Sequence, residues 1–457
     1  MLKNRIVFAL LFGAYTLSFS SAGHAQVLEG VSTETAYILN SFMFLICGVL
    51  VMWMAAGFAM LEAGLVRSRN TAAICLKNIA LYALAGLAYY LIGYNIMYVG
   101  LAEHGLWGSF EWLYNPSAAE IRLMGAEGEA LSTTTQEVTG SADYSVMSDW
   151  FFQMVFVATA ASIVSGTVAE RIKLWPFLIF VMILTAIIYP IQGSWSWGGG
   201  WLNKIGDGFS DFAGSTIVHS VGGWAALTGA IILGPRLGKY SKDGKVQPIP
   251  GSNIPLATLG TFILWFGWFG FNGGSVLAMN SAQAVTTMSV VFANTNLAAA
   301  AGTIAAMAYA TLRFGKPDLT VVLNGALAGL VAITAGPDVA NPLIAILIGG
   351  IGGLLCSIAI PLFDKLKIDD VVGALSVHLV SGIWGTMAVA IFSTGDYLAQ
   401  FTGIVAIGLF VSLTSSVIWL FLKYTIGIRV DARDERYGID ITEVGLEAYP
   451  EFESRSA

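Results

Sequence analysis

Charged side chains are scarce in this sequence: Lys, Arg, Asp and Glu make up 11% of its 457 residues, against about 25% in an ordinary soluble domain. Cysteine is scarcer still. Cys47, Cys75 and Cys356 lie in apolar runs without paired spacing, which argues against a disulfide framework and against a metal site. No long basic run suggests a nucleic-acid partner. The G-x-S-x-G, H-E-x-x-H and Walker A motifs are missing, so we expect neither an enzyme nor a cofactor.

Apolar residues, in contrast, fill most of the chain. They make up 56% of it, and the mean hydropathy is +0.73. Apolar runs of about 18–25 residues recur, each long enough to cross a hydrocarbon core as a helix. We predict an all-α membrane protein with about eleven transmembrane helices. Their expected cores are 37–61, 76–101, 149–169, 174–194, 213–234, 254–273, 282–312, 319–336, 341–363, 372–394 and 399–422.

The charges of the loops predict an orientation. Alternate loops carry "RSR", "ERIK", "RLGKYSKDGK", "RFGK" and "DKLK", whereas the loops between them contain few basic residues. The longest of these, about 102–148, contains Arg122 as its single base. Basic loops face the cytoplasm. The N-terminus is therefore expected outside, and the membrane domain, 30–425, is expected to end in a cytoplasmic tail, 426–457.

The first residues predict a signal peptide. Lys3 and Arg5 precede a short apolar run, and small residues follow in "SFSSAGHAQ". This pattern is typical of a secretory signal cut near Ala22 or Ala25, so residues 1–25 are expected to be removed. The alternative is an uncleaved first membrane helix, but the apolar run is short for a span.

One motif, D-x-x-G-x-x-x-V-H, occurs twice, from Asp211 to His219 and from Asp370 to His378. The two copies fall on the fifth and tenth spans. Because five is odd, they run through the membrane in opposite directions, which predicts two inverted five-helix halves followed by a final helix. Eight residues of helix rise about 12 Å, so each histidine is expected near the middle of the membrane, within contact of the other.

The two histidines are the candidate conduction site. The span cores contain no acidic or basic residue away from their ends, and buried ionisable groups in membranes are usually functional. Neutral imidazole donates from one nitrogen and accepts at the other, so the pair suits a small substrate that is neutral there or hands over a proton. The alternative is a structural pair bonded to neighbouring helices. Asp211 and Asp370 are expected to cap their helices, with direct substrate contact as the alternative.

Aromatic residues gather toward the predicted outer side, at 151–156, 195–201 and 265–275. Each cluster alone fits an interfacial aromatic belt. Together with the hydroxyl of Ser275, the three can instead form a vestibule for a cation, which gains about 0.5–2 kcal/mol over an aromatic face.

Several segments resemble the ammonium transporter (Amt) family. They are "GFAMLEAGLVRSRN", "AERIK", "DFAGSTIVHSVGGWAALTGAIILGPR", "WFGFNGGS" and "DDVVGALSVHLVSGIWG", spread over nearly the whole chain. The resemblance implies ammonium uptake across the cell inner membrane by a homotrimer with one pore per subunit. It also implies a possible cytoplasmic partner, a PII signal protein. Val444 departs from a histidine often found in the tail of the family.

The resemblance also implies roles for individual residues. Ammonium would be recruited by Trp197, Phe156 and Ser275, with Trp195 as the alternative tryptophan. Phe156 and Phe271 would form a stacked gate. His219 and His378 would line the pore beneath it, together with Gln153 and Trp268.

Two other readings remain beside the transporter. The first is an ammonium sensor or transceptor, although a tail of about 35 residues is short for a fused signalling domain. The second is a neutral gas channel similar to the Rh branch of the superfamily, against which the expected cation site argues.

Overall fold

Apolar helices dominate the computed structural model, which describes residues 31–451. Within residues 31–451, ten helical runs are long and apolar enough to cross a membrane, and α12 is an eleventh, shorter apolar helix. The prediction of an all-α membrane protein with about eleven helices is confirmed; the predicted signal peptide lies outside the described residues. In chain order the runs are α1 (Thr33–Leu65); η1 (Ser68–Asn70), α2 (Thr71–Ala88), η2 (Tyr89–Gly93) and α3 (Tyr94–Tyr98); α6 (Val146–Thr167); α7 (Leu174–Ile183), η3 (Leu184–Ile188) and α8 (Tyr189–Ser194); η5 (Ser215–Ser220) and α9 (Val221–Leu233); α10 (Ile254–Gly274); α11 (Ala282–Phe314); α12 (Leu319–Ile333); α13 (Pro342–Lys365); η6 (Leu375–Val380) and α14 (Ser381–Phe392); and α15 (Tyr397–Thr425).

Short helices lie between and after these runs. The long 102–148 segment contains α4 (Ala118–Met124) and α5 (Gly128–Ser141). Ser117 begins α4 with a capping box, in which its hydroxyl and the Glu120 carboxylate satisfy each other's backbone N–H groups. The turn η4 (Trp201–Lys204) follows α8, and the tail after α15 contains α16 (Ala432–Tyr437) and η7 (Asp440–Val444).

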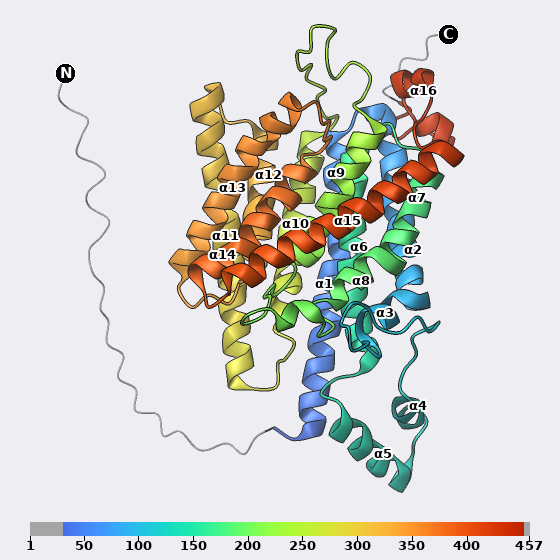
Figure 1. Ribbon diagram of the computed structural model, residues 1–457, viewed down its shortest axis with the longest axis vertical. Coiled ribbons are helices and arrows are strands. Elements are labelled where there is room, and N and C mark those ends of the chain that lie inside the picture. The colour runs from blue at the N-terminus through green and yellow to red at the C-terminus, as the bar shows by residue number, and fades with distance from the viewer. Residues whose placement is uncertain (1–30, 452–457) are drawn as a thin grey trace, which may run out of the picture. The chain divides into compact units, whose positions relative to one another are not determined.

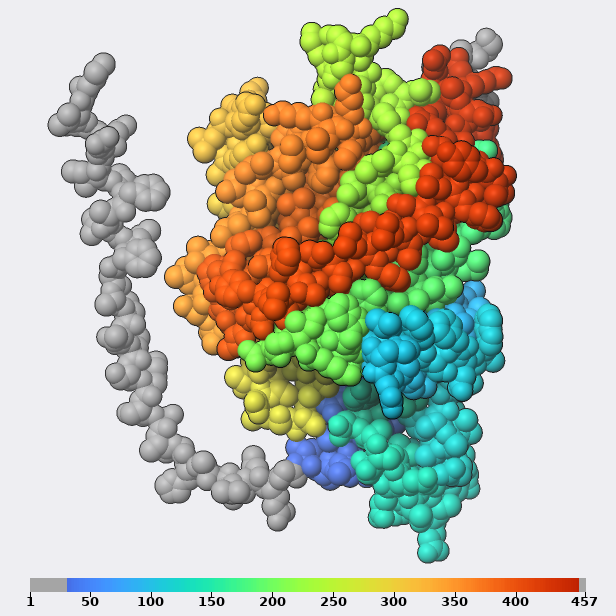
Figure 2. All heavy atoms as spheres, in the orientation of Figure 1, coloured from blue at the N-terminus to red at the C-terminus, as the bar shows by residue number. Residues whose placement is uncertain are grey.

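The last long helix, α15, has an outer apolar face. It packs obliquely across α9 and also contacts α14 (Figure 1). In the space-filling view it forms a continuous band at the surface (Figure 2). Large apolar side chains stay exposed along it at helical spacing, which suits contact with lipid. These residues are Phe401, Leu409, Leu413, Val417 and Phe421.

The two histidine segments pack against each other's halves. η5 packs on α14, and η6 packs on α9. Gly223 and Gly382 occupy equivalent positions, four residues after each histidine. An added Cβ on Gly223 would lie 2.7 Å from Leu379 Cβ, and one on Gly382 would lie 2.5 Å from Ser220 Oγ. Gly223 therefore faces Leu379, which follows His378, and Gly382 faces Ser220, which follows His219. Such reciprocal packing is expected of two related repeats.

The predicted starts of the fifth and tenth helices need a correction. Both aspartates lie before the helices: η5 begins at Ser215, after Gly214 with φ +105°, and η6 begins at Leu375, after Gly373 with φ +84°. Glycine allows this left-handed turn at low cost. His219 is thus only the fifth residue of its helical run, and the depth estimate that assumed eight helical residues was wrong.

Candidate functional site

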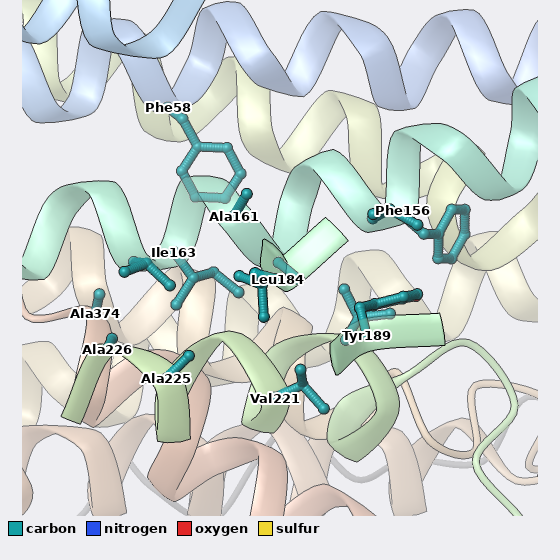
Figure 3. Packing of buried hydrophobic residues seen from close by; sticks show 14 of the residues in the cluster. Phe58, Phe156, Ala161, Ile163, Leu184, Tyr189, Val221, Ala225, Ala226 and Ala374 are labelled. Atoms are coloured by element: carbon teal, nitrogen blue, oxygen red, sulfur yellow. The ribbon is translucent and has the colours of Figure 1, made fainter. Parts of the chain in front are cut away.

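A continuous column of aromatic rings runs through the buried core. In spatial order its members are Trp197, Phe156, Phe271, His219, His378 and Phe58. Successive ring centroids lie 6.0, 4.0, 5.2, 5.2 and 6.1 Å apart. Figure 3 shows Phe58 pointing from α1 toward α6, with Phe156 farther along α6. The phenylalanine pair is stacked, with 26° between its ring planes, as the resemblance led us to expect.

The two histidines meet at the centre of this column. Their Nδ1 atoms lie 3.2 Å apart, and both side chains are buried. One Nδ1 must therefore carry the shared proton, and the other must accept it. When both rings are neutral, the donor ring keeps a lone pair on Nε2, and the acceptor ring carries N–H there. The pair thus offers one acceptor and one donor besides its own bond, and the predicted contact between the rings is confirmed.

A cavity of about 410 Å³ opens at the Trp197 end of the column. Phe156, Gln153 and Ser275 line it, and Trp197 forms part of its wall. The indole N–H of Trp197 donates to the carbonyl of Asp211, which fixes the ring. Trp195 is directed elsewhere: its N–H donates to the Leu106 carbonyl, and its ring packs on Trp201 and Phe410.

A second cavity, of about 630 Å³, lies at the other end of α10. Ile254, at the start of α10, lines this cavity, whereas Ser275, directly after the end of α10, lines the first. Asp370 and Ser376 also line the second cavity, close to the segment that carries His378. The aromatic column and the histidine pair therefore lie between two cavities.

The two aspartates cap the histidine segments, each in its own way. The Asp211 carboxylate accepts hydrogen bonds from the backbone N–H groups of residues 214–217. The Asp370 carboxylate accepts from the N–H of Leu375 and from the hydroxyl of Thr167. Burial raises the pKa of Asp370 to about 6, and burial also raises the pKa of Asp211 against the opposing effect of its backbone hydrogen bonds. Both carboxylates hold backbone in place, as the capping prediction requires.

Trp268 borders the histidine pair. Its ring stacks on His219 at 4.9 Å, and its N–H donates to the hydroxyl of Thr334. Gln153 lies in the wall of the first cavity, and its amide nitrogen is 3.5 Å from a carboxylate oxygen of Asp149.

Two buried carboxylates contradict the expectation of an interior without charge. Asp149 is 7% exposed and lines the first cavity. Glu62 is 1% exposed and lines a small cavity together with His378. The hydroxyl of Ser165 donates to Glu62, and the ammonium group of Lys77 donates to the Ser165 carbonyl. These charges fall within a residue or two of the predicted span ends, but the helices α1, α2 and α6 extend past those ends.

A buried ion-pair network lies near the second cavity, because Lys239, which lines that cavity, comes within 4.0 Å of Asp369 in the network. Arg236 bonds Asp369 at 2.8 Å and Glu170 at 3.1 Å, and Glu170 also bonds Arg67 at 2.8 Å. Arg171 is fully buried and donates to four backbone carbonyl groups: those of Thr167 and Ala169 nearby in the sequence, and those of Gly234 and Asp369 farther away. In the sequence these residues stand out only as loop charges, but in the structure they join the ends of several helices.

The tail is packed onto this same region. The Asp440 carboxylate accepts from the backbone N–H groups of Ala72 and Ala73, at the start of α2. It thus caps a helix far away in the sequence. Val444, the departure noted in the tail, packs against a small buried apolar cluster that includes Ala73.

The fold and the site define a class of protein: a multi-span membrane protein whose helices enclose a column of buried rings between two cavities. The family described as Ammonium Transporter Family matches residues 42–449. The chain is 43% identical to the ammonium transporter Amt2 of Archaeoglobus fulgidus, over 89% of this chain and 87% of that protein. It is 41% identical to a putative ammonium transporter of Synechocystis, over 97% of both chains.

Solved structures agree with these relatives. A protein titled Sensor Amt Protein matches with a TM-score of 0.81 and 35% identity, over 90% of this chain and 100% of that one. Mep2 of Saccharomyces cerevisiae matches with a TM-score of 0.74 and 24% identity, over 88% and 91%, which supports the fold alone. This chain belongs to the ammonium transporter family.

Proposed function

We propose that this protein transports ammonium across a membrane through the passage between the two cavities. An ammonium ion is recruited at Trp197, Phe156 and Ser275 and gives up its proton. Ammonia then passes the Phe156–Phe271 gate and the two histidines, and the released proton travels separately along the histidine pair, so that one positive charge crosses with each ammonium ion. The observation that carries this proposal is the continuous column of rings that links the first cavity to the buried His219–His378 pair.

The direct test is current recording from proteoliposomes after a jump in ammonium concentration. We expect inward current with ammonium and none with potassium, because potassium has no proton to give up. A sensor without transport gives no current with either ion. An Rh-like channel for the neutral gas moves ammonia without carrying charge. The absence of ammonium flux, measured by current and by internal pH, would reject transport.

The aromatic gate gives a first prediction. Phe271→Ala removes the ring between Phe156 and His219, so water can enter the passage from the first cavity. We expect a potassium or proton leak that wild type lacks, measured as background current in the same liposomes. Because Phe→Ala in a packed core costs about 3–5 kcal/mol, Phe271→Leu serves as the matched variant that keeps most of the volume. Wild-type flux and selectivity in Phe271→Ala would contradict a gate.

The recruitment site gives a second prediction. Trp197→Ala should raise the half-saturating ammonium concentration by about 2- to 30-fold, the equivalent of the 0.5–2 kcal/mol of a cation–π contact. Trp195→Ala is the matched control, because that ring packs away from the cavity; it should leave half-saturation unchanged. Methylammonium should compete with ammonium in wild type. The reverse pattern, with Trp195→Ala impaired and Trp197→Ala normal, would assign recruitment to Trp195.

We also propose the setting in which this transporter acts. The membrane domain, 30–425, would lie in the cell inner membrane as a homotrimer, with the tail, 426–457, on the cytoplasmic side. A PII signal protein would be the partner on that side. The support is the family membership and the basic loops, which gather on the same predicted side as the tail.

A further inference from the structure

The first cavity contains a carboxylate that the recruitment site proposed above does not use. Asp149 lies in the first turn of α6, one turn before Gln153 and two turns before Phe156, so the three share one face of the helix. All three line the same cavity as Trp197 and Ser275. Asp149 therefore borders the cavity in which a cation would be held.

The partners of Asp149 leave its charge uncompensated. The hydroxyl of Tyr94 donates to Oδ2, and Gln153 approaches Oδ1 at 3.5 Å. No salt bridge among the described residues involves Asp149. A carboxylate offers about four acceptor positions, so acceptor capacity remains. A buried charge with no cation is costly, and a cationic ligand would remove that cost.

The rest of the cavity wall suits a small cation. Tyr94, Tyr98 and Tyr144 line it together with Phe152 and the Trp197 indole. Aromatic faces attract cations, and low-dielectric walls strengthen the field of a carboxylate. A purely structural Asp149 would need only the Tyr94 hydroxyl, and it would not have to face the cavity.

We propose that Asp149 is the anionic counter-charge of the first cavity and holds the incoming ammonium ion before it loses its proton. This inference rests on the proposed function and adds a charged residue to its recruitment site. Asp149 then sets the affinity for monovalent cations with N–H donors, ammonium and methylammonium. Selectivity against potassium stays with the histidine pair.

The test compares Asp149→Asn with Asp149→Glu. Asparagine keeps the size and an acceptor for Tyr94, but it removes the charge; we expect half-saturation by ammonium to rise roughly tenfold or more, the range of a single charge contact. Glutamate keeps the charge and should stay within about threefold of wild type. Asp143→Asn, at an exposed neighbouring position, controls for surface charge; any effect of that substitution should vanish in high salt.

A binding measurement separates this proposal from transport itself. Ammonium should raise the melting temperature of detergent-solubilised wild type, and this shift should be lost in Asp149→Asn. If wild type shows no ammonium flux, by current and by internal pH, but shows the Asp149-dependent shift, the cation site stands and the transport proposal fails. If wild type carries current and Asp149→Asn has wild-type half-saturation and shift, transport stands and the role of Asp149 is overturned. If Asp149→Asn does not fold, Asp149→Ser, which also offers Tyr94 an acceptor, takes its place under the same criteria.

Discussion

Replacing His219 and His378 together by leucine should abolish ammonium-driven current, a loss of at least about 100-fold. The two rings supply the polar nitrogen atoms at the centre of the aromatic column, with Nδ1 atoms 3.2 Å apart. Ammonia that has left its hydration shell needs a hydrogen-bond partner there, and an unpaired polar group in an apolar passage costs about 2–7 kcal/mol. A barrier of 2.7 kcal/mol already corresponds to about 100-fold in rate.

The chain offers a matched control for this experiment. His104 is an exposed histidine outside the column, where its Nδ1 accepts from the Leu106 N–H. His104→Gln should therefore carry wild-type current. A single acidic replacement, such as His219→Glu, should instead admit an intact cation and relax selectivity against potassium. A selective wild-type current in the folded double leucine variant would make the pair structural and would contradict the mechanism.

The fold and the contact between the histidines could be predicted from the sequence for a clear reason. Spans depend on the length and polarity of each run, and both can be counted along the chain. The repeated Asp–His spacing then assigned His219 and His378 to opposite halves, so that the contact followed from symmetry. The stacking of Phe156 on Phe271 came instead from the family resemblance, because aromatic spacing alone also fits an interfacial belt.

The buried charges could not be predicted in the same way. Glu62, Lys77 and Asp149 stand near the ends of apolar runs, where a charge usually faces water. Their burial depends on how far each helix extends and on what packs over its end, which is a property of tertiary structure. The docking of Asp440 on the start of α2 is equally non-local, because its partners lie more than 360 residues away.

The predicted start of each histidine-bearing helix was wrong for a local reason. Aspartate is a good N-cap, so a helix was expected to follow at once. In both copies the glycine three residues later takes a left-handed conformation, and the carboxylate bonds past that turn to the N–H groups of the helix beyond it. The aspartates do cap the helices, but each helix begins later in the sequence than predicted.

The buried ion-pair network gives the second large effect. Arg236→Met should destabilise the protein by roughly 3–5 kcal/mol, because it leaves Asp369 and Glu170 buried without their shared cation. Arg122→Met is the matched control: its pair with Glu137 is more than half exposed, and such pairs contribute about 0–1 kcal/mol. Thermal unfolding in detergent, with fluorescence and aggregation as readouts, measures both. Equal, small losses in the two variants would mean that the network contributes little.

Acid provides an independent check on the same network. Burial opposes the ionisation of Asp369 and Glu170, but their arginine partners outweigh it. Arg236 holds the pKa of Asp369 well below its ordinary 3.8. Arg236 and Arg67 together hold the pKa of Glu170 below its ordinary 4.5. A carboxylate whose pKa is depressed on folding stabilises the protein above its unfolded pKa and loses that contribution as the pH falls through the folded value. Wild type should therefore lose stability progressively below pH 4.5. Arg236→Met has less of this contribution to lose, so the difference in melting temperature between the two proteins should shrink on acidification. A difference that stays constant from neutral pH into this acid range would show that Arg236 acts through packing and not through charge.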